Sequence, residues 1–166
     1  MTKIKIGFSK SNKKFPIMSW LIRLFQGTEF SHVYLRRDSD STGEYVYQAS
    51  GSMVNFMGID TFFKYHRVVE EFEIEIPKEV WKKVLKNILI KYAGRPYGKK
   101  QIPAIALVQF GIRADSLQDG EYAFICSEIV AEILHEANVV KKEEWDKSVD
   151  LVTPKDIYNK LEELFK

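Results

Sequence analysis

The chain has 166 residues, of which 45% are hydrophobic and 29% charged, and this composition is typical of a globular protein with one core. Its 25 lysines and arginines nearly balance 23 aspartates and glutamates, so a net charge of +2 argues against a dedicated nucleic-acid binder. The single cysteine, Cys126, excludes an internal disulfide. We therefore expect a single domain over 1–166.

Apolar segments of the length used in export or membrane insertion are missing from the sequence. The first residues, MTKIKIGFSKSNKK, contain no apolar stretch of signal-peptide length. The longest apolar run, at 102–112, is about half the length of a membrane-spanning helix and predicts a buried helix. We expect a protein without a signal peptide or transmembrane segment, located in the cytoplasm, or in the host cytoplasm or virion if it is viral.

In the first half of the chain, strand and helix patterns alternate. Apolar residues at every second position predict strands, and a polar turn between two of them predicts a β-hairpin. The segment at 16–26 is rich in apolar residues, and we expect it to form a largely buried helix. In chain order, the expected elements are a strand over 3–9, a helix over 16–26, hairpin strands over 30–37 and 44–50, and a short helix over 59–65.

The second half is mainly helical. One strand comes first, in which apolar residues alternate with glutamates, so that one of its faces meets water. Thr153-Pro-Lys-Asp156 has the pattern of a helix capping box. The expected elements are the strand over 67–76 and helices over 77–93, 101–112, 125–137 and 153–165. Strands with inserted helices, followed by helices, predict an α+β fold with an antiparallel sheet packed against helices.

Cys126 has two interpretations. It shares an apolar helical face with Val130, Ile133 and Ala137, and free cysteine is often a buried core residue. It also stands at the start of its predicted helix, where unpaired N–H groups lower the pKa of a thiol and can hold an oxyanion. The spacing alone leaves both a core residue and a nucleophile open.

A nucleophilic cysteine needs a base beside it, and the sequence offers three histidines. His66 stands at a helix-to-strand junction, and we interpret it as a surface residue. His135 lies more than two turns along the same helix as Cys126 and cannot reach a thiol at the helix start. His32, in a predicted strand, is the remaining candidate for the base, although a strand histidine is often only structural.

The hairpin predicts a third residue for this group. A turn centred on Asp40 places His32 opposite Gln48, whereas a shift of two would place it opposite Val46 or Ser50. Gln48 can accept a ring N–H and fix the tautomer of the imidazole. It can equally be an ordinary polar strand residue.

Three short patterns follow one another in a specific order: Phe30-Ser-His-Val33, Val46-Tyr-Gln-Ala49 and Ile125-Cys-Ser-Glu128. Their order resembles the circularly permuted branch of the NlpC-type papain-like cysteine hydrolases, which includes YiiX-like bacterial proteins and a poxvirus group. In that branch the histidine strand comes first and the cysteine helix comes late. Gly94-Arg-Pro-Tyr-Gly98 looks like the segment that precedes the cysteine helix, and the N-terminal third looks like versions in tailed-phage genomes.

The resemblance, which covers roughly residues 4–137, implies a role for each matching residue. Cys126 matches the nucleophile, His32 the general base and Gln48 the polar third residue, which is commonly Glu or His in the family. Backbone N–H groups at the start of the cysteine helix would hold the oxyanion, with Tyr122 and Ser127 beside the substrate. The implied fold is a permuted papain-like α+β domain, and the mechanism needs no metal or organic cofactor.

The function that we expect is a cysteine-dependent hydrolase or acyltransferase that acts on an amide, ester or thioester bond. The resemblance suggests a peptide, a peptidoglycan fragment or a lipid acyl group as substrate, and no nucleic acid. The apolar segment at 102–112 and the aromatic residues Phe56, Phe62 and Phe63 would suit an acyl pocket, but we favour a core role for them. The alternative is a catalytically inactive papain-like protein that binds a partner or belongs to a virion, because Gln48 carries no charge.

Overall fold

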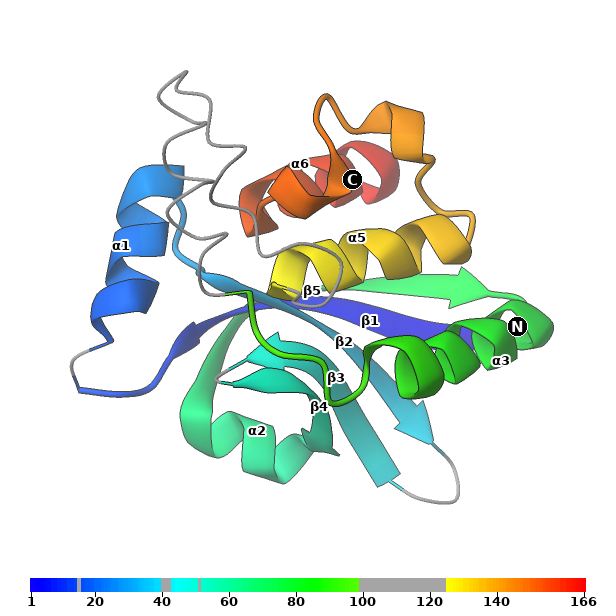
Figure 1. Ribbon diagram of the computed structural model, residues 1–166, viewed down its shortest axis with the longest axis horizontal. Coiled ribbons are helices and arrows are strands. Elements are labelled where there is room, and N and C mark those ends of the chain that lie inside the picture. The colour runs from blue at the N-terminus through cyan, green and yellow to red at the C-terminus, as the bar shows by residue number, and fades with distance from the viewer. Residues whose placement is uncertain (15, 40–42, 51, 99–124) are drawn as a thin grey trace.

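The computed structural model describes residues 1–14, 16–39, 43–50, 52–98 and 125–166 (Figure 1). Within these residues the fold is α+β, with one five-stranded antiparallel sheet and helices on both of its faces. The strand order is β4-β3-β2-β1-β5. The strands are β1 (Thr2–Ser11), β2 (His32–Ser39), β3 (Gly43–Ser50), β4 (Met53–Gly58) and β5 (His66–Ile76).

The helices divide between the two faces of the sheet (Figure 1). Helices α3, α5 and α6 share one core with the sheet, whereas α2 covers the opposite face. The α-helices are α1 (Ile17–Gln26), α2 (Ile59–Tyr65), α3 (Lys78–Asn87), α5 (Cys126–Glu136) and α6 (Pro154–Phe165), with a π-helix η1 (Ile88–Tyr92) and 3-10 turns η4 (Lys142–Glu144) and η5 (Val149–Leu151).

Strand β2 shows how the alternation of side chains feeds two cores. Val33 and Leu35 belong to the larger core, together with residues of α3, α5 and α6. Tyr34, between them, belongs to a smaller core with Val46 and Phe62 beneath α2. Because successive side chains of a strand point to opposite faces, β2 is buried on both sides.

Gly7 in β1 makes the second core possible. It pairs with Tyr34 of β2, and a methyl group added at Gly7 would lie 2.1 Å from the Tyr34 ring. The Tyr34 ring therefore lies directly over the glycine, and its hydroxyl donates to Glu71 Oε1 at 2.8 Å. A side chain at this position would displace the aromatic ring next to His32.

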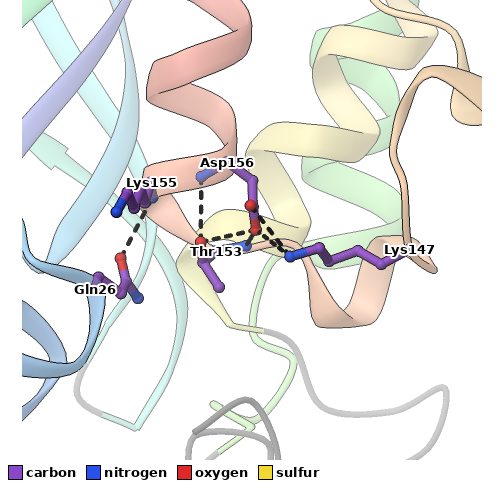
Figure 2. A network of polar contacts seen from close by, with 5 residues as sticks. All are labelled: Gln26, Lys147, Thr153, Lys155 and Asp156. Atoms are coloured by element: carbon purple, nitrogen blue, oxygen red, sulfur yellow. Dashed lines mark hydrogen bonds and ion pairs between the residues drawn. The ribbon is translucent and has the colours of Figure 1, made fainter. Parts of the chain in front are cut away.

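The N-terminus of α6 carries the predicted capping box (Figure 2). The Asp156 carboxylate accepts from the Thr153 N–H at 2.7 Å, and Thr153 Oγ1 accepts from the Asp156 N–H at 3.2 Å. Lys147 approaches the same carboxylate at 3.0 Å, and Gln26 Oε1 accepts the Lys155 N–H at 3.3 Å. Through the Lys155 N–H, the first turn of α6 is also joined to Gln26, the last residue of α1.

Most predicted elements are confirmed within one or two residues, but three predictions need correction. β4 was missing from the prediction, and the predicted helix over 77–93 changes to π geometry at Ile88. The helix over 16–26 exists, but it is not largely buried, because Gln26 is its only buried residue. The predicted helix over 101–112 lies outside the described residues.

Candidate active site

Cys126 is the first residue of α5, and its side chain is only 5% exposed. Ile125 before it is extended, and its N–H donates to the Glu128 carboxylate at 3.4 Å, which helps to fix the first turn. The apolar face of α5, which includes Ile129 and Ile133, packs against β2 and β3. The same packing that makes α5 a core helix therefore holds the thiol at the sheet.

Four hydrogen-bond donors influence the thiol of Cys126. They are the N–H groups of Val33, Ser127 and Cys126 itself, and the Tyr97 hydroxyl. Each of them lowers the pKa of the thiol because it stabilises the thiolate. Burial acts in the opposite direction and dominates, so the pKa of Cys126 is raised above its ordinary value. The resting sulfur is thus a neutral thiol among donors suited to a thiolate.

The sulfur lies against the peptide group that joins His32 to Val33. The β2–β3 ladder ends at the pair Leu35 and Tyr47, so the Val33 N–H lies beyond the last paired residues. This N–H lowers the pKa of the nearby Cys126 thiol. The start of α5 and the start of β2 therefore meet at the open end of the ladder, as the order of the sequence patterns predicts.

His32 and Gln48 form a buried hydrogen bond. His32 Nε2 lies 2.6 Å from Gln48 Oε1, and the two side chains are 7% and 2% exposed. The Gln48 amide nitrogen faces Asn55 Oδ1 at 3.4 Å and the Met57 sulfur at 3.8 Å. Because these neighbours accept from the amide nitrogen, the Gln48 oxygen accepts from His32 Nε2–H. The proton on Nε2 leaves Nδ1 as the basic nitrogen of the ring.

The register that led to Gln48 was wrong by two residues, although the contact itself exists. A turn centred on Asp40 would pair Arg36 with Glu44, but Arg36 pairs with Val46. Gln48 therefore reaches His32 diagonally rather than from the position directly opposite. Diagonal neighbours on one face of a sheet are within reach of long side chains, and glutamine is long enough.

The imidazole of His32 is neutral in this state. Its pKa is lowered to about 3, first by burial and then by His66, while the hydrogen bond to Gln48 acts in the opposite direction. A neutral imidazole is the form that can accept a proton from a thiol. Cys126 and His32 are therefore both uncharged.

The side chains of His32 and Cys126 lie on opposite sides of β2. The His32 ring contacts Tyr34 and Phe62 on the α2 side, with ring centroids 6.4 Å away in both cases. Cys126 belongs to the core on the α5 side, with Val33. Among the described residues, no hydrogen bond joins the sulfur to the imidazole. The thiol and the imidazole therefore lie near the same part of β2 without contact, and proton transfer between them would require one side chain to turn.

Tyr97 is a site residue that no role was predicted for. Its hydroxyl faces the Cys126 sulfur, and the pKa of Tyr97 is raised well above its ordinary range by burial and then by Cys126. Backbone pairing with the start of β4 holds this segment: the Tyr97 N–H donates to Ser52 O at 2.9 Å and the Val54 N–H to Arg95 O at 2.8 Å. The available signal was the Gly94–Gly98 segment, which was noted only as part of the resemblance.

His66 was interpreted as a surface residue, but it is only partly exposed and packs beside His32. It stacks on Phe62 with ring centroids 4.4 Å apart, and its centroid lies 5.0 Å from that of His32. Its Nδ1 lies 3.4 Å from Ser9 Oγ, and burial lowers the pKa of His66 to about 4. The cause is the β1–β5 pairing, which brings the first residue of β5 under α2, a contact that local spacing does not encode.

His66 also lines a cleft of about 490 Å³ on this face, together with Phe63 and Arg67. The cleft therefore reaches His66, but neither His32 nor Cys126 is among its lining residues.

The two remaining predicted site residues differ in outcome. Ser127 is fully buried on α5, and its hydroxyl has no hydrogen-bond partner among the described residues. Tyr122 lies outside the described residues. The aromatic residues considered for an acyl pocket also differ, because Phe62 is fully buried whereas Phe56 and Phe63 are exposed.

No group of three or more histidine, cysteine, aspartate or glutamate side chains suited to a metal ion occurs within the described ranges. In the same part of the chain, no helix has the length and apolar character needed to cross a membrane. Comparison of the chain with protein-family models and with curated proteins found no match.

Proposed function

We propose that the protein is a cysteine-dependent hydrolase or acyltransferase with a circularly permuted papain-like arrangement. The observation that carries this proposal is the buried 2.6 Å contact between His32 and Gln48, beside a peptide group that donates to Cys126. A cysteine at a helix start, a neutral imidazole and a carbonyl that orients it are the components of a thiol nucleophile. The resemblance of the three sequence patterns supports the same assignment.

In the proposed reaction, the Cys126 sulfur attacks a carbonyl carbon while its proton moves to His32 Nδ1. The Val33 N–H and the N–H groups at the start of α5 stabilise the developing thiolate, and Gln48 Oε1 stabilises the imidazolium. His32 then gives the proton to the leaving group as its bond to the carbonyl carbon breaks, which leaves a thioester on Cys126. Water or a second acceptor attacks the thioester, and the proton that it releases restores the thiol.

Tyr97 is the best-placed side chain to assist this step. Its hydroxyl already faces the sulfur, and it stays protonated because its pKa is raised. A protonated hydroxyl can donate to the oxyanion that forms when the sulfur attacks. The role that we expected of Tyr122 is thus assigned to Tyr97 in this proposal. The substrate classes remain a peptide, a peptidoglycan fragment or an acyl ester.

A second candidate is an inactive papain-like scaffold, which the resting geometry favours. The sulfur is 5% exposed and has no hydrogen bond to the imidazole, and the pKa of Cys126 is raised rather than lowered. An ordinary buried cysteine has the same properties.

The pH dependence of thiol alkylation separates the two candidates. A neutral Cys–His pair and its ion-pair form hold the same number of protons, so their ratio does not change with pH between the two apparent pKa values. We expect the rate of iodoacetamide labelling of Cys126 to be flat over about pH 5 to 7 in the native protein. In His32→Ala, the rate should instead rise about tenfold per pH unit, because only thiolate released by simple titration reacts.

His135→Ala is the matched control, since it removes a histidine from the far end of the same helix. It should retain the flat region, whereas Gln48→Ala should lower the rate within it. If the native protein and His32→Ala share one rising profile, or if labelling requires denaturation, the enzyme proposal is wrong and the scaffold candidate stands.

A further inference from the structure

Helix α1 is amphipathic in the reverse of the usual sense. Its polar residues face the protein: Ser19 Oγ lies 2.5 Å from Ser31 Oγ, and Gln26 accepts the Lys155 N–H (Figure 2). Most of its apolar residues face outward, whereas Leu21 and Ile22 are partly buried. The outward residues are Ile17, Met18, Trp20, Leu24 and Phe25, which are between 44% and 68% exposed. A helix of a globular domain normally buries this face, so the exposed face of α1 is suited to an apolar environment outside the protein.

The chain segment that contains α1 is basic. From Lys10 to Thr28 the chain contains four basic residues and no acidic one. Lys13 and Lys14 are exposed immediately before the helix, and Arg23 lies on it. The nearest acidic residue along the chain is Glu29, which is 4.0 Å from Lys10. A helix with tryptophan, phenylalanine and leucine on one face and basic residues at its border has the composition of helices that lie in membrane interfaces.

We propose that α1 binds the surface of an anionic lipid membrane, with Trp20 and its apolar neighbours in the headgroup region. The basic residues supply attraction to anionic headgroups, and the exposed apolar face supplies the insertion. The inference does not depend on thiol chemistry, so it stands or falls separately from the proposed function.

The location of α1 gives this binding a consequence for the site. Ser31, which Ser19 contacts, directly precedes His32, so the polar face of α1 rests on the segment that leads into β2. Membrane binding would therefore bring the open end of the β2–β3 ladder close to the lipid surface.

The tryptophans make the proposal directly measurable. Of the three in the chain, Trp81 and Trp145 are 3% and 7% exposed, whereas Trp20 is 53% exposed. We expect the tryptophan fluorescence emission of the full-length protein to shift to shorter wavelength when vesicles of phosphatidylcholine and phosphatidylglycerol are added. Vesicles of phosphatidylcholine alone should change it little. Trp20→Phe should abolish the emission shift. The variant should still bind the vesicles and therefore sediment with them on centrifugation.

Three variants test the apolar and basic contributions by sedimentation with the same vesicles. Ile17→Glu should weaken binding about tenfold, because it replaces inserted apolar surface by a charge. Lys13→Gln and Lys14→Gln should each weaken binding to anionic vesicles about fivefold. The matched control is Ile90→Glu, since Ile90 on η1 is 72% exposed and Ile17 is 68% exposed. This control should bind like the native protein.

Three results would overturn the proposal. The first is native protein that stays in the supernatant with anionic vesicles. The second is Trp20 emission that is already at short wavelength in buffer, because another part of the chain then covers α1. The third is a dimer that Ile17→Glu converts to a monomer, because a second copy is then the occupant of this face.

Discussion

Helices α1 and α5 have comparable sequence patterns but opposite orientations toward the protein. α5 places Ile129, Ile133 and Leu134 in the core and leaves part of its polar side outside. α1 places Gln26 inside and leaves most of its apolar residues outside. Hydrophobic periodicity therefore predicts the existence of an amphipathic helix but not which of its faces the protein covers. Side-chain anchors such as Ser19 and Gln26 decide that for α1.

The largest effect should come from truncating the buried face of α5. Ile133→Ala removes a fully buried side chain, and we expect it to lower the free energy of unfolding by about 2–5 kcal/mol. Chemical denaturation of the purified variant measures this loss. A loss below about 1 kcal/mol would mean that the α5 core is loosely packed and that the contrast with α1 is overstated.

Acid should destabilise the folded protein through His32, which is buried, and His66, which is partly buried. The pKa of His32 is lowered to about 3 and that of His66 to about 4, so the unfolded chain binds their protons first as pH falls below about 6.5. Above that pH, each histidine makes its full contribution to the free energy of unfolding. As the pH falls, this contribution decreases by up to about 1.4 kcal/mol per pH unit. Denaturation curves between about pH 6.5 and pH 4 should show this decline.

His66→Gln should reduce this pH dependence, because the unfolded variant no longer gains that proton. His135→Gln, in the last turn of α5, is the control and should keep the slope of the native protein. An unchanged slope in His66→Gln would show that its imidazole is not held neutral by burial.

A smaller effect should follow from loosening the polar side of α1. Gln26→Ala removes the acceptor of the Lys155 N–H, and we expect a loss of about 1 kcal/mol. Gln26→Glu keeps an acceptor oxygen at the same place and should retain most of the stability. Thermal unfolding of both variants tests the anchor, and equal melting temperatures would refute it.

The smallest effect should come from the apolar side of α1. Ile17→Ala removes a side chain that is 68% exposed, so the free energy of unfolding should change by less than about 0.5 kcal/mol. Ile17→Ala and Ile133→Ala are the same substitution on α1 and α5, so the difference between their losses of stability reflects the burial of the two side chains. A loss above about 2 kcal/mol would mean that the apolar face of α1 is covered within the folded protein.

Local patterns were sufficient for much of the site. His32 and Gln48 belong to one hairpin, so strand alternation placed them on the same face even though the register differed by two. Cys126 was placed correctly at a helix start because its apolar face and its position after an extended residue are both local. The roles of these three residues remain predictions.

The residues that sequence reasoning missed depend on distant pairings. Tyr97 reaches Cys126 only because its segment pairs with β4, the strand that was not predicted. His66 reaches His32 only because β5 pairs with β1. Neither pairing has a local signal, since it depends on which strands the whole chain brings together.

The separation of the site residues along the chain has a consequence for the order of folding. His32 and Gln48 are 16 positions apart, and their hairpin closes a short loop. Cys126 must instead dock from a helix that follows all five strands. Because long loops close more slowly, we expect the imidazole and its amide partner to be in place before α5 arrives. The thiol would then reach the site only when α5 packs on the hairpin that already holds the imidazole.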